Sequence, residues 1–265
     1  MPTTHDEILS LQRGQWARSL LQFALLLVVV LVCCGYVGLF DTRRLAEGVP
    51  SILSLVAEML PPDFSDVRRW GRPLLDTVAM SVAGTALAVV FSLPLALLAA
   101  RNTTPHPLLY RAARGLLNGL RTIPELILGI IFVAAVGFGA LPGVLALGLH
   151  SIGMVGKFFA EAVEHADEAP IQAVRAAGAS PLQVIVHGIL PQVLPRLADT
   201  TVYRWEYNFR ASTVMGAVGA GGIGLELIAA LRIMHYQSVS AILLLIFVMV
   251  TLVDGLGSRR RRRFR

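Results

Sequence analysis

The chain has 265 residues, of which 55% are hydrophobic and only 15% are charged. Soluble domains carry about 25% charged residues, so this composition excludes an ordinary soluble protein and indicates an all-α membrane protein with several spans. The net charge of +6 is concentrated in the arginines of residues 259–265, and because this run directly follows an apolar segment, it indicates contact with anionic lipid at the cytoplasmic side rather than with nucleic acid.

The apolar segments are long enough for a polytopic helical bundle of about six spans. A helix needs about 20 apolar residues to cross the hydrocarbon core. Five segments reach this length, and Arg204, Glu206 and Arg210 partly hide a sixth. In chain order the predicted spans are Leu20–Phe40, Leu74–Ala100, Leu117–Phe138, Leu141–Phe159, Leu197 to about Val218, and Val239–Leu256.

The first span and the loop after it form a separate N-terminal part. No small-residue cleavage site follows Leu20–Phe40, so we expect a retained span rather than a removed signal peptide. Cys33 and Cys34 are adjacent inside this span and predict no disulfide or metal framework. Val49–Leu60 has apolar residues at helical spacing, and we expect it to lie along the membrane surface or to pack on the spans.

Charge bias gives the predicted spans an orientation. Six spans place both termini on one side, together with the basic loop 101–116 and segment 160–190. Because arginine-rich flanks stay in the cytoplasm, this side is predicted to be cytoplasmic and the 41–73 loop external. The predicted parts are therefore 1–73 (tail, first span and external amphipathic loop), 74–256 (core), and 257–265 (basic cytoplasmic tail).

The segment Gln172–Pro191 is too polar for a span and predicts two short helices joined by a sharp bend. The first helix is expected to end at Gly178, which can adopt the left-handed conformation. Ser180 is a good N-cap and Pro181 a good first residue for the second helix, which Pro191 is expected to end. Such a projection suits the groove of another protein, although an ordinary helical hairpin is the simpler alternative.

This segment resembles the EAA loop of ABC importer permeases. Aligned on Gly178, residues 172–174 stand at the E-A-A positions, Gly188 stands at the isoleucine position with Ile189 one place late, and Leu190-Pro191 complete the pattern. Gln172 replaces the usual glutamate, so contact with the partner ATPase is expected to depend on shape more than on a salt bridge. The resemblance implies these ATPase-coupling residues: Gln172, Ala173, Gly178, Ala179, Ser180, Pro181, Leu190 and Pro191.

A narrower resemblance, covering roughly residues 70–256, is to the phosphonate branch of these permeases. The segments that carry it are residues 121–125, 203–214 and 219–224. It implies a type I importer permease without enzymatic activity, which works with a second permease copy, a cytoplasmic ATPase dimer and an external or periplasmic substrate-binding protein in the bacterial inner membrane. The implied substrates are phosphonates and reduced phosphorus oxyanions such as phosphite and hypophosphite. The alternatives are an importer for methionine or another small solute, and an autonomous secondary transporter.

Residues 219–224 also match a dinucleotide-binding pattern of glycines, but they follow a span rather than a strand. We therefore expect close backbone packing or a bend there. The sequence lacks a phosphate-binding loop, so ATP and Mg²⁺ are assigned to the partner ATPase and no cofactor to this chain. The histidines show no metal-binding spacing, and His150 is expected to be satisfied or solvated.

Charged and polar residues inside the spans are candidates for a translocation path, because they are costly in lipid. A forked guanidinium suits phosphorus oxygens. The alternative is structural, with Glu206 paired to Arg210, Glu125 paired to Arg121, Arg204 reaching the interface and Asp254 solvated. The candidates are Arg204, Glu206, Asn208, Arg210, Ser212, Thr213, Arg121 and Glu125.

Overall fold

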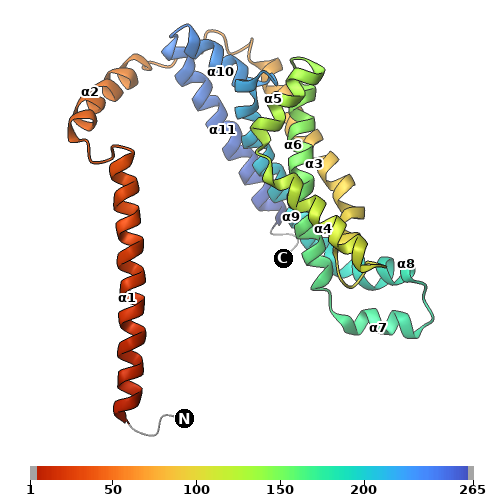
Figure 1. The fold of residues 1–265 in the computed structure, drawn as a ribbon. Helices are drawn as coiled ribbons and strands as arrows, with labels where there is room; N and C mark the ends of the chain where they lie inside the picture. Colours follow the sequence, from red (N-terminus) through yellow and green to blue (C-terminus); the bar gives the residue numbers. More distant parts are fainter. Residues whose placement is uncertain (1–4, 262–265) are drawn as a thin grey trace. The chain divides into compact units, whose positions relative to one another are not determined.

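The computed structural model describes residues 5–261, and within that range every regular element is a helix, as predicted (Figure 1). The chain divides into two compact units, Met1–Glu58 and Met59–Arg265. Four helices are long and apolar enough to cross a membrane, and six spans result if each of two bent helix pairs counts as one. This agrees with the predicted number.

The N-terminal unit consists of α1 (His5–Tyr36) and α2 (Thr42–Glu58). The span-length part of α1 is Arg18–Tyr36, which matches the first predicted span. In α2, the exposed apolar side chains of Leu45, Val49, Ile52 and Val56 recur at helical spacing. The helix expected at Val49–Leu60 is therefore present and begins earlier than predicted.

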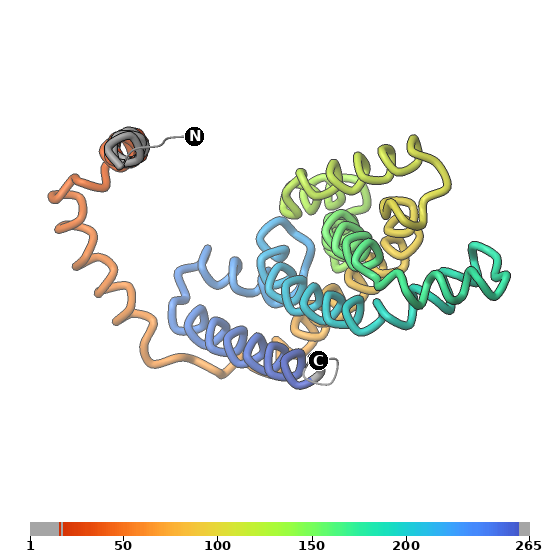
Figure 2. Tube along the Cα trace, turned by 90° about the horizontal axis from the view of Figure 1, so that it is seen from below, coloured from red at the N-terminus to blue at the C-terminus, as the bar shows by residue number. Residues whose placement is uncertain are grey.

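The core unit is organised around α6 (Ala140–Glu164), whose glycines and alanines are largely buried. It packs most extensively on α3 (Gly71–Ala99), and Figure 2 shows it among α3, α4, α5 and α9. A Cβ on Gly84 of α3 would stand only 3.1 Å from Leu147 Cβ, so the absence of a side chain lets the helices approach closely. Ser92 Oγ donates to the Ile152 carbonyl oxygen across the same contact, at 3.2 Å.

The third predicted span is wrong as a single helix. Residues 107–136 form α4 (Pro107–Thr122) and α5 (Glu125–Val136), which meet at 85°. Pro124 cannot donate to a helix, and it holds the preceding Ile123 in an extended conformation with φ −86° and ψ 119°. At the other end, Pro107 and the His106 side chain start α4 inside the segment that we expected to be a loop.

The predicted bend at residues 219–224 is confirmed. It joins α9 (Leu190–Met215), through a short turn at Gly216–Val218, to α10 (Ile223–Arg232), and the pair is bent by 43°. Gly219, Gly221 and Gly222 have φ values of 91°, 75° and 72°, which favour glycine. α11 (Tyr236–Arg261) then forms the last span.

Candidate docking segment and buried polar network

The docking segment, defined here as residues 167–192, has the predicted helix–bend–helix form. Asp167 caps α7 (Glu168–Ala176) by accepting from the Ala169 backbone N–H at 3.1 Å. Gly178 follows with φ +83°, a left-handed conformation that lets the chain reverse. Ser180 and Gln183 then form a reciprocal capping box at the start of α8 (Pro181–Gln183).

Pro191 does not end the second helix, contrary to expectation. α8 continues through a π-helical turn at Val184–Ile189 directly into α9. The wider turn, in which the Leu190 N–H donates to the Ile185 carbonyl oxygen, accommodates a proline that would clash in an ordinary α-helix. The Gln192 side chain donates to the Gly188 carbonyl oxygen at 2.6 Å, so this carbonyl is also satisfied. The docking segment is thus continuous with the span that follows it.

The predicted coupling residues lie on the outside of the docking segment. Gln172, Ala173, Gly178, Ser180, Pro181, Leu190 and Pro191 are exposed and Ala179 is half-buried. Ile171, Val184 and Ile189 are buried on the inner side. A Cβ on Gly188 would already stand 3.4 Å from Ile171 Cα, so Ile189 supplies the buried apolar contact one place later.

Arg204 joins a buried polar network between three helices. The residue is only 4% exposed, its Nε donates to Ser151 Oγ at 2.8 Å, and its guanidinium lies 4.2 Å from the centre of the Tyr207 ring. Ser151 donates to Asn208 Oδ1 at 3.0 Å, and Asn208 Nδ2 donates to Thr85 Oγ1 at 2.9 Å. The alternative in which Arg204 reaches the interface is therefore wrong.

Glu125 is connected to the same network from α5. The Tyr207 hydroxyl donates to Glu125 Oε1 at 2.7 Å, and His150 Nε2 lies 3.3 Å from Glu125 Oε2. The other ring nitrogen of His150 is 3.0 Å from the Ile123 carbonyl oxygen, which confirms a satisfied histidine. Glu125 thus pairs with α6 and α9 rather than with Arg121, because the bend at Pro124 separates the two residues.

The remaining path candidates lie apart from this network. Arg210 forms an ion pair with Asp254 of α11 at 3.2 Å rather than the alternative pair with Glu206, and the Asp254 side chain is 40% exposed, so Asp254 is both solvent-accessible and paired. Glu206 is 3% exposed and its carboxylate lies against Gly257. Ser212 and Thr213 donate to carbonyl oxygens of their own helix, at Phe209 and Arg210.

Sequence reasoning missed Ser151, Tyr207 and Thr85 as members of the network. Ser151 stands in a glycine-rich span, where a small residue indicates packing as readily as hydrogen bonding. Tyr207 lies within residues 203–214, one of the segments that carry the resemblance. Its spacing of four residues from Tyr203 indicates only that the two rings share a helix face, and it does not predict a partner on α5. Among the described residues, no group of three histidine, cysteine or acidic side chains could hold a metal ion.

A bent-span helical bundle with a projecting helical hairpin and buried charges is typical of a membrane transport subunit. Residues 92–265 match the model of the binding-protein-dependent transport system inner membrane component family, and the chain belongs to this family. It is a permease subunit of an ABC importer, and importers of this family work with an ATPase and a substrate-binding protein.

Two relatives and one solved structure illustrate this membership. The chain is 66% identical over 250 residues to the phosphite transport system permease protein PtxC of Stutzerimonas stutzeri, covering 94% of this chain and 91% of that one. It is 44% identical to the phosphate-import permease protein PhnE of Mycolicibacterium smegmatis, covering 84% of this chain and 42% of that one. An inward-facing structure of the MetNI methionine ABC transporter matches with a TM-score of 0.64 and 25% identity, covering 74% and 96% of the two chains.

Proposed function

We propose that this permease carries phosphite or a related phosphorus oxyanion, such as a phosphonate or hypophosphite, into the cytoplasm. The observation that carries the substrate class is Arg204. Its Nη2 is buried and has no hydrogen-bond partner among the described residues, so one arm of the guanidinium is left for an acceptor from outside this part of the chain. A negatively charged phosphorus oxygen is such an acceptor. The extensive identity with a phosphite permease supports the same substrate class.

The network around Arg204 supports a role in the translocation path. Hydrogen bonds of this network connect four helices, α3, α5, α6 and α9, through Thr85, Glu125, Ser151, Tyr207 and Asn208. A movement of the Arg204 side chain would therefore affect all four helices. A buried charge that only stabilised the fold would be expected to satisfy its donors internally. The candidate path is therefore centred on Arg204 and Asn208, with Glu125 as the counter-charge.

The remaining partners follow from the surfaces that the chain leaves exposed. The outer side of the docking segment presents Ala173, Gly178 and Pro181. These small side chains and the bend of the segment fit a groove of the cytoplasmic ATPase dimer, and that dimer binds ATP and Mg²⁺. α9 exposes Arg196, Tyr203 and Arg210, which suit a water-filled path or a second permease copy better than lipid. Both termini then lie in the cytoplasm of a bacterial inner membrane, and the binding protein delivers substrate from outside.

The test is reconstitution of the chain with its ATPase and its substrate-binding protein in proteoliposomes. Uptake and ATP hydrolysis are measured with phosphite, hypophosphite, methylphosphonate, phosphate and methionine. We expect a phosphorus oxyanion to stimulate both and methionine to stimulate neither. Stimulation by methionine alone would assign the other importer class, and uptake that persists without any ATPase would identify a secondary transporter. Arg204→Met separates the path from the fold, because it should lower uptake while the complex still assembles.

A further inference from the structure

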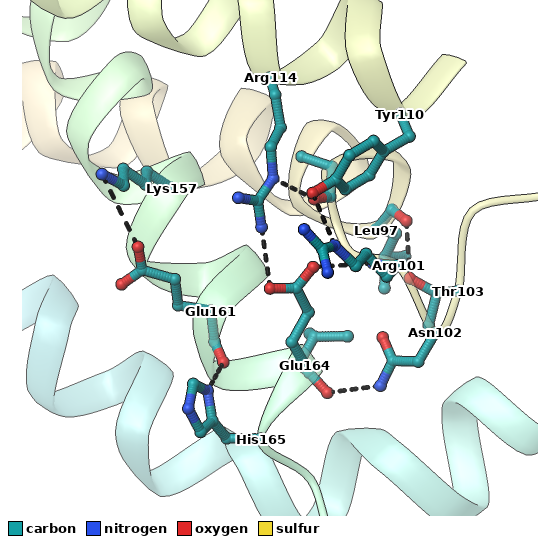
Figure 3. Close-up of polar contacts among 12 residues, drawn as sticks. Leu97, Arg101, Asn102, Thr103, Tyr110, Arg114, Lys157, Glu161, Glu164 and His165 are labelled. Atoms are coloured by element: carbon teal, nitrogen blue, oxygen red, sulfur yellow. Dashed lines mark hydrogen bonds and ion pairs between the residues drawn. The ribbon is translucent and has the colours of Figure 1, made fainter. Parts of the chain in front are cut away.

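The end of α6, immediately before the docking segment, is tied to the connection between α3 and α4. Glu164 is the last residue of α6, and both of its carboxylate oxygens accept hydrogen bonds (Figure 3). Oε1 accepts from the Arg101 backbone N–H at 2.9 Å, and Oε2 accepts from Arg114 Nη2 at 2.8 Å. One residue earlier, the Val163 carbonyl oxygen accepts from Asn102 Nδ2 at 2.7 Å. A single turn of α6 thus holds the α3–α4 connection at two points, Arg101 and Asn102, and α4 itself at a third, Arg114.

Arg114 extends this attachment to the end of α3 and the start of α4. Its Nε donates to the Ala99 carbonyl oxygen at 3.0 Å, and its guanidinium lies 4.9 Å from the centre of the Tyr110 ring. Arg101 Nε donates to the Tyr110 hydroxyl at 3.0 Å. The side chains of Arg114 and Glu164 are only 33% and 21% exposed, so water screens this pair less than an ordinary surface pair.

The docking segment is closed at its base. Gln192 Oε1 accepts from the Asp167 N–H at 2.9 Å, and Gln192 Nε2 donates to the Asp167 carbonyl oxygen at 3.2 Å. The Gln192 amide therefore joins the two ends of the segment, because it both accepts from and donates to the backbone of Asp167. Because only two residues separate Glu164 from Asp167, a displacement of the segment reaches Glu164 directly.

Two cavities lie between the docking segment and the α3–α4 connection. One cavity of about 300 Å³ lies between Asn102 and Thr103 on one side and Arg175 and Pro181 on the other. A second, of about 230 Å³, lies between Asn102 and the α7 residues Gln172 and Arg175. At these places the segment does not rest directly on the α3–α4 connection. Nearby, Ile171, Val184 and Ile189 share a hydrophobic cluster with Ala99 and Ala100, and the end of α6 adds a polar attachment to this apolar packing.

We propose that Glu164 is a positioning residue that transmits movement of the docking segment to α3 and α4. This role rests on the proposed docking of the ATPase on residues 167–192. When the ATPase displaces the segment, the hydrogen bonds of Glu164 to Arg101 and Arg114 make the ends of α3 and α4 move with it. Without them, only non-directional apolar packing joins the two parts, so part of the displacement is taken up at the cavities and ATP is hydrolysed with less transport.

The decisive measurement is the ratio of substrate transported to ATP hydrolysed in proteoliposomes that contain the permease, its ATPase and its binding protein. Glu164→Ala removes both of these hydrogen bonds and should lower this ratio at least about tenfold, since losing one charge-assisted hydrogen bond already corresponds to about that factor, while stimulated hydrolysis stays within a factor of two. Glu161→Ala is the matched control. It lies one turn earlier on α6, and its carboxylate contacts Lys157 of the same helix at 3.8 Å, so its removal should leave the ratio unchanged.

Glu164→Gln keeps the length and one acceptor oxygen, and should give an intermediate ratio. If Glu164→Ala does not assemble, this variant decides the question, because an unchanged ratio overturns the proposal and a lowered one supports it. Equal losses of transport and hydrolysis would also overturn it, since they would indicate a purely structural role. If the unsubstituted complex fails to transport any phosphorus oxyanion, the proposed function fails instead.

A distance measurement gives an independent readout. Spin labels at His106 and Ala169, in a chain with Cys33 and Cys34 replaced by serine, report on the α3–α4 connection and α7. In the parent chain the interlabel distance should stay the same when ATP binds, because both labels move together. In Glu164→Ala it should change on ATP binding. A distance that behaves identically in both chains overturns the proposal.

Discussion

Substitution of Gly153 by alanine should weaken the crossing of α4 and α6. A Cβ at Gly153 would stand 2.8 Å from both the Arg121 backbone nitrogen and the Leu117 carbonyl oxygen. Ordinary contact begins at 3.4 Å, so the helices would have to separate by about 0.6 Å (3.4 − 2.8). Overpacking of this kind costs about 1–3 kcal/mol, and because backbone atoms cannot rotate away, we expect the upper part of that range. The gain in helix propensity offsets about 1 kcal/mol, which leaves a net loss of about 2 kcal/mol.

Two other glycines in the same pair of helices provide graded controls. At Gly156 the obstructing atom is the Cδ2 methyl of Leu117, which can change rotamer, so Gly156→Ala should cost less than Gly153→Ala. At Gly115 of α4 nothing lies within 4 Å, so Gly115→Ala should gain up to about 1 kcal/mol from helix propensity.

The assay is size-exclusion chromatography of detergent-solubilised protein after heating, which gives the temperature at which half of the folded peak is lost. About 2 kcal/mol corresponds to roughly 4–8 °C for a chain of this size. For Gly153→Ala this temperature should therefore be lower than in the parent chain by that amount. For Gly156→Ala it should lie between those of Gly153→Ala and the parent chain, and for Gly115→Ala it should equal or exceed that of the parent chain. A Gly153→Ala protein as stable as Gly115→Ala would refute the inference that backbone contact limits the approach of the two helices.

Three further outcomes are expected. Arg204→Met should lower uptake about 10- to 100-fold, corresponding to a lost hydrogen bond to a charged group of about 1.5–3 kcal/mol, and full uptake at normal expression would remove Arg204 from the path. Arg210→Asp should reduce the amount of folded protein in the membrane, measured by quantitative immunoblotting, and the combination with Asp254→Arg should restore part of it. Equal losses in the single and double variants would show that the pair contributes nothing. Gly178→Ala places a methyl group in open space but at φ +83°, so its effect comes from backbone strain of about 1–2 kcal/mol alone. This strain should weaken co-purification of the ATPase. Gly178→Asn should weaken it less, because asparagine tolerates this conformation better.

Features that depend on neighbouring residues could be predicted from the sequence. The spans that became α3 and α11 are continuous apolar runs, so hydropathy alone locates them. The bend at Gly178 and the cap at Ser180 obey rules that operate within four residues. The exposed positions of Ala173 and Pro181 follow from the same local pattern.

Features that depend on distant residues could not be predicted in this way. Four-residue spacing suggested a partner for Glu125 on its own segment, whereas its actual partner, Tyr207, is 82 residues away in sequence. Arg210 likewise reaches a residue 44 positions later. The effect of proline also depends on its surroundings, because Pro124 produces a sharp bend whereas Pro191 is absorbed by a π-helical turn. A single sequence does not distinguish these two outcomes.

The ion pair between Arg210 and Asp254 has a consequence for biosynthesis. The ribosome adds Asp254 44 residues after Arg210, which takes about 2–9 s at about 5–20 residues per second. During this interval α9 carries Arg210 before the carboxylate that pairs with it in the complete fold has been made. Nascent chains that stop before α11 therefore lack one of the two charges of this pair.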